Sequence, residues 1–147
     1  MTNLENEILV REIGKLAGFF GGFGARAAAR RLPVEQYEIK IEVPLAAGEV
    51  RIRTSQVLRS LGVLVDDFAL ETEPDTLSAV VGSGHMNLNP TIVHVQFVGA
   101  SDNSSQLAIK GIAKEGIVKQ DSARKAVERI IALLSDKDAH HITESDR

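Results

Sequence analysis

The sequence predicts an α+β fold: a mainly antiparallel sheet of four to six strands, with an N-terminal Gly-rich helix, a short helix and a long C-terminal helix packed on one face. Apolar residues recur every three or four positions in the first thirty residues and again near the end, but every second position in several segments between them. The links between the later strands are short and polar, whereas a parallel crossover needs about a dozen residues, so these strands are antiparallel. The chain has 147 residues, of which 44% are hydrophobic, and this suits one domain with a single core.

The first segment, residues 4–32, has a helical pattern. Large apolar residues follow one another at alternating steps of four and three, which places them on one side of a helix: Leu9, Ile13, Leu16, Phe20 and Phe23. Pro33 ends the segment because the residue before a proline is disfavoured in the helical region. We therefore predict one long helix, followed at residues 36–43 by a strand in which apolar and polar residues alternate.

The remaining elements follow from the same two periods. Residues 49–53 predict a short strand or an extended lead-in, and residues 54–62 predict a short helix that ends at Gly62. Residues 68–72 and 77–82 flank a Pro-Asp turn and predict a hairpin. Two further strands are predicted at residues 91–98 and 106–114, and an amphipathic helix at residues 121–134. We expect residues 1–135 to form one domain and residues 136–147 to form a polar, flexible tail.

This order of elements is similar to the helix-grip and TBP-like layouts, in which a long last helix lies across an antiparallel sheet. The resemblance concerns the order of the elements alone, because the sequence carries no motif of either group. It implies that the last helix covers the inner face of the sheet.

The composition excludes several classes of protein. The chain has no cysteine, so it forms no disulfide, thiolate nucleophile or cysteine-based metal site. No apolar run approaches the roughly 20 residues that span a bilayer, and the first residues are acidic where a secretory signal is basic, so we expect a cytoplasmic protein. The net charge of −3 comes without a concentrated basic patch, which argues against nucleic acid as a partner.

The stretch from residue 14 to residue 31 contains five glycines and three phenylalanines. Gly22, Gly24 and Ala27 satisfy the G-x-G-x-x-A pattern of a dinucleotide-binding loop, and Glu42 follows twenty residues after Gly22. Such a loop follows a buried strand, however, whereas the residues before Gly22 have helical spacing. The dinucleotide interpretation is therefore disfavoured, and we expect no cofactor.

On a single helix, the small residues of this stretch gather on a second face, nearly opposite the large apolar residues: Gly14, Gly18, Gly21, Ala25 and Ala28. A glycine inside a helix costs roughly 0.5–1 kcal/mol relative to alanine, so several glycines require a compensating contact. Small residues allow another backbone to approach closely. We hypothesise that this glycine face meets another copy of the chain, a partner protein or a membrane surface. The alternatives are packing against the C-terminal helix of the same chain, or a break at Gly21 and Gly22 that divides the segment into two helices.

Residues 82–90 are a second candidate site. This uncharged segment joins two strands and contains His85, Asn87 and Asn89. His85 and His94 could form an acid–base pair or supply two metal ligands. Because the segment offers no carboxylate as a third ligand, we predict no metal site and keep these four residues as candidates for ligand binding. The alternative is that Asn87 and Asn89 hydrogen-bond the turn while His94 lies on a solvated face of the sheet.

Cationic residues cluster in sequence around the beginning of the last predicted helix: Lys110, Lys114, Lys119, Arg124 and Lys125. Because the N–H groups at a helix N-terminus also attract negative charge, these residues are candidates for binding an anion. The alternative is that they lie on solvated faces of the strand and the helix.

Two functional interpretations follow, and the absence of a diagnostic catalytic motif leaves open whether the chain is an enzyme. The first is a non-catalytic α+β module that self-associates or binds a partner through the glycine face of its N-terminal helix. The second is a small-ligand binder or helix-grip-type enzyme with a pocket between the sheet and the C-terminal helix, near His85.

Overall fold

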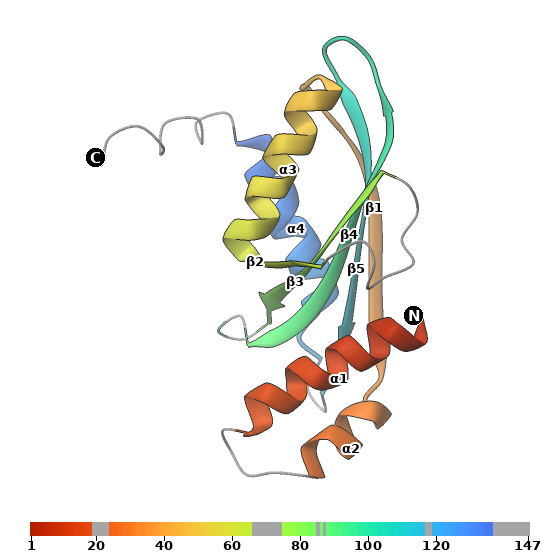
Figure 1. The fold of residues 1–147 in the computed structure, drawn as a ribbon, viewed down its shortest axis with the longest axis vertical. Helices are drawn as coiled ribbons and strands as arrows, with labels where there is room; N and C mark the ends of the chain where they lie inside the picture. Colours follow the sequence, from red (N-terminus) through yellow and green to blue (C-terminus); the bar gives the residue numbers. More distant parts are fainter. Residues whose placement is uncertain (19–23, 66–74, 85, 87, 117–118, 137–147) are drawn as a thin grey trace, which may run out of the picture.

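The computed structural model describes residues 1–18, 24–65, 75–84, 86, 88–116 and 119–136. These residues form a five-stranded sheet with the strand order β1-β5-β4-β3-β2, in which every neighbouring pair is antiparallel (Figure 1). The strands are β1 (Val34–Val43), β2 (Gly62–Val65), β3 (Thr76–Ser83), β4 (Asn89–Ala100) and β5 (Ser105–Lys114). The predicted α+β fold with an antiparallel sheet is confirmed.

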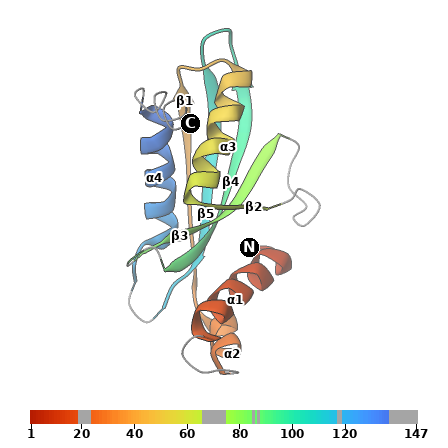
Figure 2. The same cartoon turned by 60° about the vertical axis from the view of Figure 1, so that its left-hand side comes forward.

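Two helices, α3 (Ala47–Leu61) and α4 (Ser122–Ser135), lie side by side against one face of the sheet (Figure 2). In the layer between them and the sheet, Val93, Val95 and Ile109 pack with Val127 and Ile130, and all five side chains are fully buried. The strand residues come from every second position and the helix residues from positions three apart, as the two sequence periods require. With β1 beside β5 and α4 across the sheet, the core has the predicted helix-grip or TBP-like layout.

Gly111 on β5 lets α4 approach the sheet closely. A Cβ atom at this position would lie 2.7 Å from the carbonyl oxygen of Ala123 and 2.9 Å from Cγ2 of Val127. Both distances are too short for real Cβ contacts, so only glycine allows α4 to lie where it does.

The N-terminal helices α1 (Asn3–Gly18) and α2 (Gly24–Arg31) pack on each other at one end of the molecule (Figures 1 and 2). α1 packs on the sheet face opposite α3 and α4, where Ile8 and Leu9 contact Ile92 and Ile112. The predicted placement of all helices on one face therefore holds for α3 and α4 but differs for α1. α1 packs on this other face because Ile92 and Ile112 make that face of the sheet apolar at this end.

The predicted single helix over residues 4–32 is wrong, because α1 ends at Gly18 and α2 begins at Gly24. This agrees with the alternative of two helices, although the expected break at Gly21 and Gly22 lies outside the described residues. Gly18 and Gly24 occupy helix ends, where glycine is well tolerated. Gly14 is the one glycine inside a described part of either helix. The free-energy cost of glycine relative to alanine within the described helices is therefore about 0.5–1 kcal/mol, less than a single helix with several internal glycines would carry.

Two predictions in the middle of the chain need correction. Residues 49–53 are not extended but belong to α3, whose buried Val50, Thr54 and Val57 have helical spacing. β2 has no counterpart among the predicted strands, and it pairs with β3. The strand predicted at residues 68–72 lies outside the described residues. No helix in the described part of the chain is both long and apolar enough to cross a membrane.

Candidate functional site

A chain of hydrogen bonds attaches α1 to the sheet. His94 on β4 accepts or donates a bond at both ring nitrogens: Nδ1 lies 2.8 Å from Oγ of Ser78 on β3, and Nε2 lies 2.9 Å from Oε1 of Glu5 on α1. Glu5 also closes the beginning of α1, because its Oε2 atom accepts a bond from the N–H of Thr2 while Thr2 Oγ1 accepts the N–H of Glu5. This reciprocal pair is a capping box, so the T-x-x-E pattern at residues 2–5 was a usable sequence signal.

The environment of this network favours an ionised Glu5 and a neutral His94. Burial acts to raise the pKa of Glu5, but the Thr2 N–H and His94 outweigh it and hold that pKa below its ordinary value. Burial lowers the pKa of His94 more than Glu5 raises it, and Lys110 contributes to the lowering. The imidazole can therefore donate its single proton to Glu5 and accept the hydroxyl proton of Ser78.

A serine, a histidine and a carboxylate that are linked by hydrogen bonds in this order resemble a catalytic triad. A nucleophilic serine must meet its substrate, however, and Ser78 is only 3% exposed. The network therefore positions α1 on the sheet. His94, predicted as a ligand-binding residue or a solvated sheet residue, instead joins β3, β4 and α1.

α2 is attached to the sheet by Lys114 at the end of β5. Lys114 is 2% exposed, and its Nζ atom donates a 3.3 Å hydrogen bond to the carbonyl oxygen of Arg30 in the last turn of α2. A cation at a helix C-terminus is favourable, although burial lowers the pKa of Lys114. Ala29 is also buried, and the N–H of Glu115 donates to the carbonyl oxygen of Pro33. Lys114 thus occupies neither an anion site nor a solvated face.

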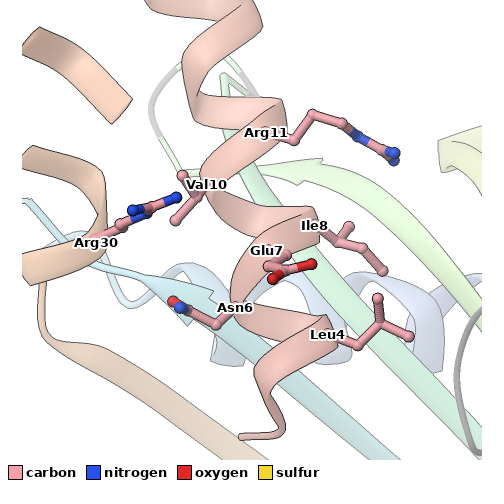
Figure 3. A pocket seen from close by; sticks show the side chains of 7 residues that line it. All are labelled: Leu4, Asn6, Glu7, Ile8, Val10, Arg11 and Arg30. Carbon is pink, nitrogen blue, oxygen red and sulfur yellow. The ribbon is translucent and has the colours of Figure 1, made fainter. Parts of the chain in front are cut away.

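An open groove of about 310 Å³ lies over the outer surface of α1 and is closed on one side by α2 (Figure 3). We call it the N-terminal groove, and its lining residues are Leu4, Asn6, Glu7, Ile8, Val10, Arg11 and Arg30. Glu7 lies between an apolar side formed by Leu4 and Ile8 and a polar side formed by Asn6 and Arg30 (Figure 3).

Three polar side chains of the N-terminal groove have atoms without a protein partner among the described residues. The Oδ1 atom of Asn6 is buried and has no hydrogen-bond partner there. The side chains of Glu7 and Arg30 likewise make neither an ion pair nor a hydrogen bond with any described residue. Glu7 and Arg30 are exposed, so this surface presents one negative and one positive charge to a ligand. The buried oxygen of Asn6 is not itself accessible to a ligand.

The predicted glycine face is divided between the two helices. Gly14 is partly buried within α1, and Ala28 on α2 is exposed. Gly18 is the last residue of α1 and Ala25 is the second residue of α2. Gly21 lies outside the described residues. The five positions therefore do not form one continuous helical face, although α1 and α2 both border the N-terminal groove.

The second predicted site, residues 82–90, adjoins the beginning of α4. His85 and Asn87 lie outside the described residues. Asn89 donates from Nδ2 to the carbonyl oxygen of Lys114 at 3.0 Å and to Oγ of Ser122 at 2.7 Å. Ser83 donates to the carbonyl oxygen of Ser122. These bonds fasten the end of β3 and the beginning of β4 to α4.

The chain's own carboxylates occupy the N-terminus of α4. Glu115 accepts the N–H groups of Gln120 and Ser122, and Glu35 on β1 accepts the N–H of Ala123. These N–H groups hold the pKa of Glu115 below its ordinary value although burial acts to raise it, whereas burial and the neighbouring Glu115 raise the pKa of Glu35. The predicted attraction of an external anion to these N–H groups is therefore not supported.

Within the described ranges, no group of three or more histidine, aspartate or glutamate side chains is arranged to hold a metal ion. A comparison with models of known protein families gives no match, and a comparison with curated protein sequences also gives none.

Proposed function

We propose that this chain is a non-catalytic binding module and that its N-terminal helix pair, α1 and α2, forms the surface that binds a segment of a partner protein. The observation that carries the proposal is the N-terminal groove, in which the exposed side chains of Glu7 and Arg30 lie beside an apolar wall. Neither side chain has an ionic partner among the described residues.

A peptide segment matches the mixed chemistry of this groove. An apolar side chain of the segment packs against Leu4, which is 38% exposed. Glu7 and Arg30 pair with groups of opposite charge on the partner. Arg30 is suited to a bidentate contact with a carboxylate, because its guanidinium presents two parallel donors.

The attachment of the helix pair also supports this role. Glu5 and His94 fix α1, and Lys114 fixes α2, so the groove is preorganised by contacts that lie behind it. A preorganised surface loses less conformational entropy on binding than one that must first assemble. The small-ligand alternative has less support, since the described layer between α4 and the sheet is filled by apolar side chains.

Selection of displayed random peptides on the intact chain tests the proposal. We expect enriched peptides to bind the wild type and to lose about tenfold or more in affinity for Arg30→Ala, the loss of one charge-assisted bond. Arg59→Ala is the matched control, because Arg59 is an exposed arginine on α3 outside the groove. Peptides that bind Arg30→Ala as tightly as the wild type, or a selection that enriches none, would contradict the proposal.

A further inference from the structure

The two edges of the sheet differ in how well they are protected from pairing. β2, at one edge, has four residues, whereas β1, at the other, has ten residues paired with β5 without a register shift. Proteins protect sheet edges with short strands, prolines, bulges or repelling charges. β1 contains no proline and no bulge, so its charges decide whether its open edge can pair.

The hydrogen-bond register determines which backbone groups of β1 point away from the sheet. The N–H of Glu115 donates to the carbonyl oxygen of Pro33, the residue directly opposite it in the β1–β5 register. In an antiparallel pair, residues that bond each other directly alternate with residues that do not. Odd-numbered residues of β1 therefore bond β5, and the N–H and C=O groups of Gln36, Glu38, Lys40 and Glu42 point outward.

We propose that this edge pairs with β1 of a second copy of the chain, antiparallel and with the two-fold axis at Ile39, to give a continuous ten-stranded sheet. This register places Glu38 opposite Lys40 of the second copy and Lys40 opposite its Glu38. The same register sets Gln36 opposite Glu42, and all of these residues have outward backbone groups. The opposite charges at positions 38 and 40 thus attract where a single charge type would repel.

Neighbouring registers are less favourable. An axis at Glu38 or at Lys40 would place two like charges directly opposite each other, which destabilises a cross-strand pair. A register displaced by one residue would join the apolar face of one sheet edge to edge with the polar face of the other, so the apolar side chains of the two copies would lie on opposite sides of the joined sheet. The axis at Ile39 instead aligns Tyr37 with Ile41 on the α4 side, where both are only partly buried within one chain.

This interface is distinct from the N-terminal groove, because none of the lining residues of that groove belongs to β1. The chain would therefore pair with itself along β1 and still present one N-terminal groove per copy. Failure of one proposal leaves the other to be judged by its own experiment.

Light scattering over a concentration series from about 10 µM to about 1 mM tests the pairing. We expect the wild type to reach the mass of a dimer. Glu38→Lys and Lys40→Glu should each weaken dimerisation about tenfold or more, because each places like charges opposite each other twice. The matched control is Glu42→Lys, which changes the same charge on the same face but opposite the neutral Gln36, and should change dimerisation less than about threefold.

The single variants also provide a rescue. When Glu38→Lys is mixed with Lys40→Glu, every lysine meets a glutamate across the interface, so a heterodimer should form about as readily as the wild-type dimer. This rescue separates lost pairing from lost folding, since Glu38 lies opposite Lys110 within its own sheet and the first variant also introduces a like charge there. A wild type that is monomeric throughout, a Glu38→Lys variant that behaves like Glu42→Lys, or a mixture without heterodimer would overturn the proposal.

Discussion

The Nε2 atom of His94 lies 2.9 Å from the Oε1 atom of Glu5, although 89 positions separate the two residues in the sequence. This contact joins the first helix to the middle of the sheet and defines the back of the proposed binding surface. Its strength should therefore control how firmly α1 is held.

Replacing His94 with leucine should lower the free energy of unfolding by about 2–4 kcal/mol. The substitution leaves the carboxylate of Glu5 and the hydroxyl of Ser78 buried without their partner. Urea unfolding measures the loss. The double variant Glu5→Leu/His94→Leu should lose less than the sum of the two single variants, and strictly additive losses would mean that the two residues are not coupled.

The same contact predicts a dependence of stability on pH. Because the folded chain holds the pKa of His94 below the ordinary 6.5, the unfolded chain takes up this proton first as the pH falls, and stability declines below about pH 6.5. Glu5, whose pKa is also lowered, adds a further decline below about pH 4.5. Unfolding should be compared at about pH 7.5 and about pH 5.5 for the wild type and His94→Gln. An equal decline in both proteins would contradict the assignment to His94.

Gly111→Ala tests the close approach of α4 to the sheet. The new methyl group would meet the carbonyl oxygen of Ala123, a backbone atom that cannot turn aside, so we expect a loss of about 1–3 kcal/mol in unfolding free energy. Gly99→Ala is the control, because a Cβ atom there has no neighbour within 4 Å. Thermal unfolding of the two variants gives the comparison, and equal midpoints would refute the packing argument.

Glu115→Ala should destabilise the beginning of α4. Both oxygens of this carboxylate accept backbone N–H groups, and their loss leaves the buried N–H of Ser122 and the partly buried N–H of Gln120 without this partner, at a cost of about 1–3 kcal/mol. Hydrogen exchange at Gln120 and Ser122 should accelerate more than exchange in the middle of α4. Glu128→Ala, which removes an exposed ion pair with Arg124, should leave exchange at Gln120 and Ser122 unchanged. Unchanged exchange in Glu115→Ala would show that the carboxylate is dispensable.

The elements with a strong period could be predicted from the sequence. β1 alternates apolar and polar residues along most of its length, and α4 repeats its apolar residues at three and four positions. The predicted bounds of both therefore lie within about two residues of the observed ones. The sequence predicts only the later part of α3, because the helix has no side-chain cap at Ala46 and because Arg51, Ile52 and Arg53 alternate like a strand. β2 is four residues long and starts at Gly62, which also marks the end of a helix.

The candidate site could be predicted only in part. The sequence singles out His94, but its partner Glu5 lies on a helix whose position depends on the apolar contacts of Ile8 and Leu9 with the sheet. The glycine stretch indicated the N-terminal region as a binding surface on the assumption of one helix. The groove instead requires α1 and α2 to fold back on each other, and a period within one segment does not encode the angle between two segments.

The most direct measurement of the central claim is a map of backbone amide chemical shifts for the full chain as a selected peptide is added. The account predicts the largest changes at Asn6, Glu7 and Arg30, with little change at Val127 and Ile130 in the layer between α4 and the sheet. Changes concentrated at α4 and β5, with α1 and α2 unaffected, would contradict the N-terminal groove as the binding surface and would favour a ligand site beneath α4.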